Sequence, residues 1–206
     1  MKKKRRLSYC NAIVICHGKS EVQIVQHIRQ SLKINIKEYA ELNGKCGYKS
    51  IQINGIKKIL ANTIFKDLKS LEKKYDLDIS GKGKDKKINN FKIFIIMDTD
   101  DCSDEQKKNF INCSMFHNHW AYEYIVPIYN NNNLEDVIRE THIEYKKEKS
   151  ERLKELYIDI FPISGCEQTD ELNEFLRKLE KVNKTNMDVF VRYCIEHSRC
   201  QNKALE

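Results

Sequence analysis

The sequence has few of the residues that break regular structure, and it lacks the features that direct a chain to export. Of its 206 residues, seven are glycine, two are proline and one is tryptophan. No segment approaches the ~18 apolar residues that a membrane span needs, so we expect no membrane partner. The apolar run at residues 12–16 is too short for the hydrophobic region of a signal peptide. We therefore expect a cytoplasmic protein.

Closely spaced cysteine pairs are also absent. The eight cysteines are scattered along the chain and form no CxxC pair. Scattered cysteines in a chain without an export signal are typical of free thiols in a reducing compartment and not of a disulfide framework.

Net positive charge is nearly absent from the body of the chain, although the formal net charge of the whole is +7. Five of these charges belong to Lys2, Lys3, Lys4, Arg5 and Arg6, which leaves +2 for the remaining residues. A short basic tail can contact any polyanion, so we interpret it as a nucleic-acid contact or as a solubilising terminus.

Short apolar runs rich in β-branched residues predict the strands. We expect strands at residues 12–16, 34–36, 91–97 and 124–129; Pro127 indicates that the last is an edge strand or that it ends there. Segments with helical spacing of apolar residues separate these runs. The alternation predicts an α/β fold with a small, mostly parallel, Rossmann-like sheet flanked by helices.

The helices are predicted from apolar spacing and from capping residues. We expect Ser20 to cap a first helix, and the later helices to span about 56–71 and 104–116, to begin at Leu134, and to follow a capping box at Thr185 and Asp188. The predicted organisation is a basic tail at 1–9, an α/β domain at 10–142, and a helical C-terminal extension at 143–206 that packs on it.

Unusual polar residues follow two of the predicted strands. The first strand leads into His17, Gly18, Lys19, Ser20 and Glu21, and the strand at 91–97 leads into Asp98 and Asp100. In open parallel sheets, functional groups gather beyond the carboxyl ends of the strands. Two neighbouring carboxylates repel each other, and a hard cation relieves that repulsion. The alternative is an acidic loop that caps a helix or faces water.

Together, the segments AIVICHGKSE and IFIIMDTDD resemble the TOPRIM domain, the metal-binding module of topoisomerases, bacterial primases and OLD-type (overcoming lysogenization defect) nucleases. That family has an apolar strand ending in a glutamate–glycine turn and a later hydrophobic strand ending in DxD. The OLD-type version often adds a second acid after the turn, and Glu21 occupies that position. The resemblance covers about residues 11–138, and NLED at 133–136 looks like the further acidic site of OLD-type members.

This resemblance implies a site for Mg²⁺ or Mn²⁺. Glu21, Asp98 and Asp100 would hold one or two ions, and Glu135 or Asp136 would complete a second position. Glu21 has an alternative role, because a carboxylate in a first helical turn also stabilises the helix dipole.

His17 departs from the family pattern, which has glutamate at this position. Histidine can serve as a general base or as a ligand, and it prefers Mn²⁺ to Mg²⁺; the substitution is equally consistent with a domain that binds without cutting. Lys19 could contact a phosphate or remain solvated. A P-loop is excluded, because Ile13 occupies the position that requires glycine.

The function predicted from this resemblance is metal-dependent phosphodiester hydrolysis on DNA or RNA, which the OLD-type likeness connects to bacterial or phage defence. The alternative is a catalytically lapsed module that binds nucleic acid or a nucleotide. A partner such as an ATPase is also expected, since OLD-type TOPRIM domains occur with one. His117, His119 and Trp120 form a weaker cluster that we interpret as a helix end packing its tryptophan.

Overall fold

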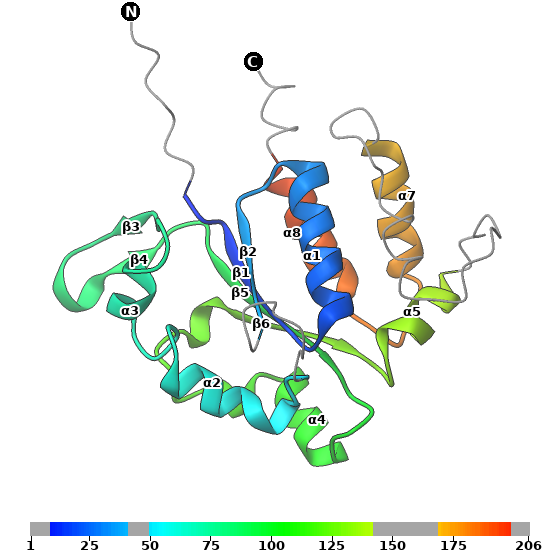
Figure 1. The fold of residues 1–206 in the computed structure, drawn as a ribbon, viewed down its shortest axis with the longest axis horizontal. Helices are drawn as coiled ribbons and strands as arrows, with labels where there is room; N and C mark the ends of the chain where they lie inside the picture. The colour runs from blue at the N-terminus through cyan, green and yellow to red at the C-terminus, as the bar shows by residue number, and fades with distance from the viewer. Residues whose placement is uncertain (1–8, 41–49, 142–168, 199–206) are drawn as a thin grey trace, which may run out of the picture.

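The computed structural model describes residues 9–40, 50–141 and 169–198, which form a parallel sheet with helices on both faces (Figure 1). The sheet has the strand order β2-β1-β5-β6. The α/β class with a parallel, helix-flanked sheet and a C-terminal helical part is therefore confirmed. The strands are β1 (Ala12–Cys16), β2 (Ile36–Tyr39), β5 (Lys92–Asp98) and β6 (Ile125–Asn130).

The register of the sheet places β1 and β5 in its centre. Ala12 is aligned with Ile36 of β2 on one side and with Lys92 of β5 on the other. β6 forms an outer edge and contains Pro127, as expected for a residue that cannot donate a backbone hydrogen bond to a further strand. The two central strands are almost entirely buried, which explains why they contain continuous apolar runs and do not alternate in polarity.

Helices connect these strands and cover the sheet. They are α1 (Lys19–Leu32), α2 (Ile56–Asn62), α3 (Leu68–Glu72), α4 (Asp104–Ile111), α5 (Leu134–Glu140), α7 (Thr169–Leu179) and α8 (Met187–Glu196). Short 3₁₀ turns occur at Ile53–Gly55, Gly83–Asp85, Ser114–Phe116 and Tyr122–Tyr124. None of the helices in the described ranges is long and apolar enough to cross a membrane.

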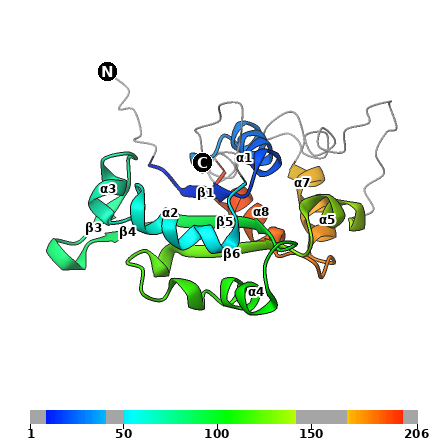
Figure 2. The ribbon, with the colours of Figure 1, turned by 60° about the horizontal axis from the view of Figure 1, so that its bottom comes forward.

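Each face of the sheet carries its own hydrophobic core. Val14 and Phe94 point to the face covered by α1, α7 and α8, whereas Ile15 and Ile95 point to the face covered by α2, α3 and α4. Figure 2 shows α1 and α4 on opposite sides of the strands. The C-terminal helices α7 and α8 thus share a core with α1 and with β1, β5 and β6.

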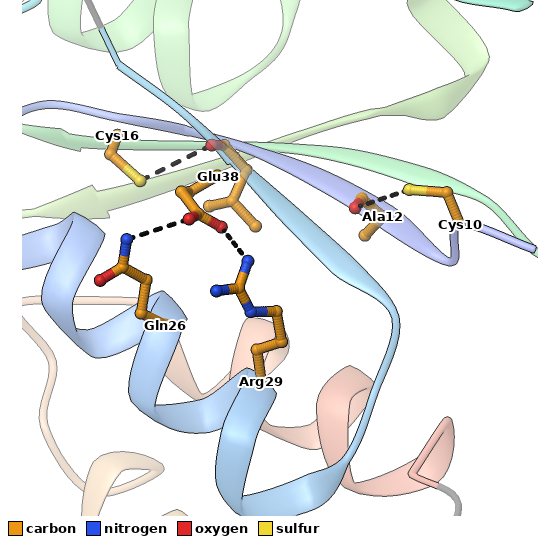
Figure 3. A network of polar contacts seen from close by, with 7 residues as sticks. Cys10, Ala12, Cys16, Gln26, Arg29 and Glu38 are labelled. Atoms are coloured by element: carbon orange, nitrogen blue, oxygen red, sulfur yellow. Dashed lines mark hydrogen bonds and ion pairs between the residues drawn. The ribbon is translucent and has the colours of Figure 1, made fainter. Parts of the chain in front are cut away.

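Side-chain hydrogen bonds connect the edge strand β2 to α1. The Glu38 carboxylate accepts hydrogen bonds from Gln26 Nε2 (3.0 Å) and from Arg29 Nη1 (2.7 Å), both on α1 (Figure 3).

All five cysteines in the described ranges are free thiols. Cys10 and Cys16 each donate to a backbone carbonyl two residues away.

The predicted long helix at 56–71 is wrong, because the chain leaves the helical conformation between α2 and α3. Thr63 has extended backbone angles, and its hydroxyl donates to Ile59 O (2.7 Å). Phe65 is fully buried, and its carbonyl accepts from Trp120 Nε1 (2.6 Å). Asp67 then caps α3 by accepting from the Ser70 N–H (2.6 Å). A continuous helix would lose the cap that Asp67 provides, because an N-cap residue has extended and not helical backbone angles.

Two smaller expectations also differ. The predicted helix at 104–116 ends at Ile111 and is followed by a 3₁₀ turn. Before β5 the chain forms a two-stranded antiparallel hairpin, β3 (Ile79–Ser80) and β4 (Lys87–Ile88), which was not predicted from the sequence. Thr185 does not form a capping box, since Asn186 is the N-cap of α8, while the Thr185 hydroxyl accepts from the Met187 N–H (3.0 Å).

Candidate functional site at the carboxyl edge of the sheet

The two polar segments predicted from the sequence meet at one edge of the sheet. β1 and β5 are parallel neighbours, with Cys16 aligned with Ile96, and the His17 N–H donates to Ile96 O (3.0 Å). From β1 the chain continues to β2 on one side and later to β5 on the other. The strand order therefore reverses between β1 and β5, which is where ligands bind in open α/β sheets.

Glu21 is held at this edge by the first turn of α1. The N-cap of the helix is Gly18, whose N–H donates to Glu21 Oε2 (2.7 Å), so the predicted cap Ser20 lies within the helix and not at its N-cap. The Glu21 side chain is buried. A Cβ atom on Gly18 would lie 3.4 Å from the same oxygen, a tight contact. A small residue at this position lets the backbone approach the carboxylate.

His17 is fixed by two hydrogen bonds to one residue. Its Nδ1 lies 3.0 Å from Ile51 O, and its own carbonyl accepts from the Ile51 N–H (2.8 Å). A carbonyl oxygen can only accept a hydrogen bond, so Nδ1 carries the proton in this contact. The neutral ring then has its lone pair on Nε2, the nitrogen that can take up a proton or bind a metal.

Asp98 and the following residue are buried, whereas the next two acids are exposed. Asp98 and Thr99 are 8% and 7% exposed, and Asp98 Oδ1 accepts from Asn130 Nδ2 (3.1 Å). The Thr99 N–H and hydroxyl both donate to the Asn130 carbonyl (3.0 and 3.2 Å). Asp100 and Asp101 therefore begin the exposed part of the turn. The two acids of the DxD motif thus lie in different environments.

Asn130 connects the acidic strand end to the C-terminal part of the chain. It is fully buried, pairs with Asp98 across β5 and β6, and accepts a hydrogen bond from the Thr185 hydroxyl (2.9 Å). Sequence reasoning missed this residue. A signal was present, because Asn130 follows the strand at 124–129 as Asp98 follows the strand at 91–97. The partner Thr185 has no comparable signal.

A lysine that sequence reasoning also missed lies near the end of β6. Lys107 Nζ, on α4, contacts Asn131 Oδ1, one residue beyond the strand. The predicted Lys19 is exposed at the start of α1.

Of the two acids predicted to complete a second metal position, Asp136 lies among the described side chains. The Asp136 N–H donates to Asn133 Oδ1 (2.9 Å), and the Asp136 carboxylate contacts Arg139 Nη1 (2.9 Å). This carboxylate serves the first turn of α5 and pairs with a cation of the same helix. The side chain of Glu135 and the basic tail Lys2–Arg6 lie outside the described residues.

The cluster of His117, His119 and Trp120 has packing contacts. His119 Nε2 lies 3.3 Å from Leu60 O, and Trp120 donates to Phe65 O. Burial lowers the pKa of the His119 imidazole below its ordinary value. These contacts agree with the interpretation that the cluster packs its tryptophan.

The donor set at the carboxyl edge is compatible with Mg²⁺, although it is small. Among the described residues, no group of three or more His, Cys, Asp or Glu side chains is arranged to hold a metal ion. Mg²⁺ usually keeps several water ligands and binds through one or two carboxylates together with substrate phosphates. Glu21 and Asp98 can supply that number of carboxylates. Whether the carboxylates of Glu21, Asp98 and Asp100 converge on one ion stays a prediction.

Comparisons of the chain with protein-family models, with curated proteins and with solved structures found no match.

Proposed function

We propose that the protein catalyses metal-dependent phosphodiester hydrolysis on nucleic acid at the carboxyl edge of β1 and β5. The observation that carries this proposal is the parallel alignment of these strands, which brings the His17–Glu21 turn and the Asp98 strand end to one switch point of the sheet. The resemblance to OLD-type TOPRIM nucleases supports the same reaction. It also suggests a cytoplasmic role in defence and an ATPase partner.

The protein's own residues would prepare the site for this reaction. Asn130 orients the Asp98 carboxylate, and the Gly18 N–H orients Glu21, so both acids have defined positions before a ligand arrives. His17 presents Nε2 as a proton acceptor, because Ile51 O holds Nδ1–H. A divalent ion bound to Glu21 and Asp98 would stabilise negative charge on the phosphate and lower the pKa of a water ligand.

A second candidate function is binding of nucleic acid without cleavage. The specific observation in its favour is His17, which stands where the family pattern has glutamate. In this case the same edge would bind a phosphate group without hydrolysing it.

A cleavage assay with the full chain tests the first proposal. Labelled single- and double-stranded DNA and RNA are incubated with Mg²⁺, with Mn²⁺ and with EDTA. We expect cleavage with at least one metal and none with EDTA. Asp98→Asn should lower the rate by at least about 10- to 100-fold. Loss of a residue that only orients a metal ligand already costs that much, and Asp98 is proposed as a ligand itself. No cleavage of any substrate by the wild type would contradict the proposal.

The matched control is Glu196→Gln, which removes the same charge from an exposed residue at the end of α8. This variant should cleave at the wild-type rate. Equal rates for Asp98→Asn and the wild type would assign the activity to a contaminant. A thermal shift tests the metal site independently of the reaction: Mn²⁺ should raise the melting temperature of the wild type and not that of Asp98→Asn. Such a shift in a wild type that does not cleave would favour the second candidate.

A further inference from the structure

A concentration of positive charge lies at the opposite, amino edge of the sheet. Residues 66–92 contain nine lysines and five acidic residues, a net charge of +4. The whole chain beyond its basic tail carries only +2, so the remaining part is slightly acidic. We define the lysine surface by six exposed lysines that follow α3 or lie in the hairpin: Lys73, Lys74, Lys82, Lys84, Lys86 and Lys87.

Two contacts hold the hairpin of the lysine surface against the rest of the fold. Lys86 Nζ contacts Glu72 Oε1 (3.0 Å), which joins the hairpin to the end of α3. The Ile88 N–H donates to Tyr124 Oη (3.0 Å), which joins it to the segment before β6. The turn of the hairpin needs glycine, because Gly81 has φ +83° and a Cβ atom there would lie 2.3 Å from Asp85 O. Figures 1 and 2 both show α3, β3 and β4 side by side, away from α4 and α5.

Most of this charge is not neutralised within the described part of the chain. Of the six lysines, Lys86 alone forms an ion pair with a described residue. Five exposed lysines on neighbouring segments therefore have no ion pair among the described residues, and their shared excess of positive charge attracts anions. A polyanion can pair with several of them at once.

The basic tail joins the fold on the same side. The Cys10 N–H donates to Asp76 O (2.8 Å), so the chain enters the sheet beside the connection between α3 and β3. The described part of the chain therefore starts on the side of the sheet that carries the lysine surface.

The surroundings favour a nucleic-acid backbone over a protein partner. Protein interfaces depend on buried aromatic or apolar anchors. The large hydrophobic side chains that are exposed in the described ranges are Tyr9, Ile111, Tyr122 and Val189, and none lies within residues 66–92. A neighbouring depression of about 600 Å³ is lined by Lys87 and Lys92 but also by Asp78 and Glu123, so it offers no net charge to a small anion.

We propose that the lysine surface binds the phosphate backbone of a nucleic acid at the amino edge of the sheet, apart from the candidate site at the carboxyl edge. The seven residues of β5 separate the two edges by roughly 20 Å, at about 3.3 Å per residue. A duplex rises 3.4 Å per base pair, so a strand longer than about six base pairs can span that distance. A nucleic acid can therefore be docked on the lysines without any contact with Asp98.

Fluorescence polarisation with the full chain tests this surface. Labelled duplex and single-stranded oligonucleotides longer than ~20 Å are titrated in EDTA, which removes any contribution of bound metal. The triple variant Lys82→Glu, Lys84→Glu, Lys87→Glu should weaken binding at least about tenfold. The slope of log affinity against log salt should become shallower by up to about three on duplex DNA, because each lost phosphate contact contributes about 0.9.

The matched control is the triple variant Lys57→Glu, Lys58→Glu, Lys181→Glu, which has the same net charge and changes exposed lysines of α2 and of the α7–α8 connection. Its affinity should stay within about twofold of the wild type. Circular dichroism checks that both triples fold, and the milder Lys→Gln triple of the hairpin should show a smaller loss in the same direction. Equal losses in both Glu triples would overturn the proposal, because they would indicate a long-range effect of net charge.

Two further outcomes would also overturn the proposal. The first is that the wild type binds no oligonucleotide at low salt. The second is that the hairpin triple variant binds oligonucleotides as the wild type does but no longer binds vesicles of phosphatidylserine and phosphatidylcholine. Because this assay needs neither metal nor cleavage, failure of the lysine surface and failure of the proposed reaction are distinguishable.

Discussion

The side-chain amide of Asn130 donates a hydrogen bond to Asp98 Oδ1 over 3.1 Å, although 32 positions separate the two residues in the sequence. The orientation of the amide is set from its other end, where Asn130 Oδ1 accepts from the Thr185 hydroxyl (2.9 Å). The backbones of Asn130 and Thr185 also form an antiparallel bridge. One buried side chain thus connects an acidic strand end with the segment that begins α8.

The Thr185 hydroxyl should contribute measurably to stability. Thr185→Val keeps the shape of the side chain but leaves Asn130 Oδ1 and the Met187 N–H without their partner in a buried position. An unsatisfied buried polar group costs about 1–3 kcal/mol, so we expect a loss of that size in urea unfolding. Thr185→Ser retains the hydroxyl and should lose clearly less. A loss for Thr185→Val no larger than that for Thr185→Ser would contradict a dominant role of these hydrogen bonds, because Thr185→Val keeps the methyl group and removes only the hydroxyl.

Much of the fold could be predicted from local sequence pattern. The central strands are continuous runs of β-branched and aromatic residues, and β1 has the predicted bounds because the apolar run ends where Gly18 permits the helix to start. The helix at 56–71 could not be predicted correctly. Its apolar spacing is helical, but the break depends on Trp120, which donates to Phe65 O from 55 positions away.

The candidate site shows the same limit. The two strand ends and their acidic residues could be identified, because carboxyl ends of parallel strands share an edge. The groups that orient them could not: Ile51 holds His17 from another connection, and Thr185 reaches Asn130 from the other end of the chain. Such contacts depend on tertiary packing and leave no periodic pattern in the sequence.

His119 should make stability depend on pH in a defined window. Burial lowers its pKa below the ordinary value of 6.5, so the unfolded chain binds a proton more readily than the folded chain. Protonation would also disturb Nδ1, which accepts from the Ala121 N–H (3.2 Å) while Nε2 contacts Leu60 O. This contribution to the free energy of unfolding is complete above pH 6.5 and decreases as the pH falls below that value.

Urea unfolding at several pH values between about 5 and 8 measures this effect, within the range where histidine titrates. The decrease in stability below pH 6.5 should be smaller in His119→Gln than in the wild type. The control is His117→Gln, because His117 is an exposed neighbour in the same segment, and its pH dependence should match the wild type. A pH dependence in His119→Gln as steep as in the wild type would contradict the role of His119.

Thiol labelling should separate the cysteines by their burial. Burial raises the pKa of Cys10 to about 11 and raises those of Cys16 and Cys194 as well, so their reactive thiolates are scarce. Cys102 and Cys113 are only partly buried. Alkylation of the native protein near pH 7, followed by mass spectrometry, should modify Cys102 and Cys113 before the other three. Labelling in urea should modify all five of these cysteines. Early labelling of Cys16 in the native protein would contradict the burial of β1.

The interaction between His17 and Ile51 gives a test of the proposed reaction. If Nε2 accepts a proton or binds the metal, His17→Ala should lower the cleavage rate by about 10²-fold or more, the contribution typical of a general base. His17→Gln is the matched control for size and polarity, because it can still donate to Ile51 O but presents no basic nitrogen. It should be as slow as His17→Ala, whereas a rate near that of the wild type would show that His17 has only a structural role.

Replacing His17 with the glutamate of the TOPRIM pattern distinguishes cleavage from binding. His17→Glu would present carboxylate oxygens, which suit Mg²⁺ better than a mixed nitrogen and oxygen site does. If the wild type cleaves, this variant should keep activity and shift its preference from Mn²⁺ toward Mg²⁺, as measured by rates at equal concentrations of the two ions. If only the variant cleaves, the natural chain is a binding module whose histidine has removed the reaction. If neither cleaves any nucleic acid with either ion, the hydrolysis proposal fails, and metal binding alone would not restore it, because carboxylates bind cations without performing chemistry.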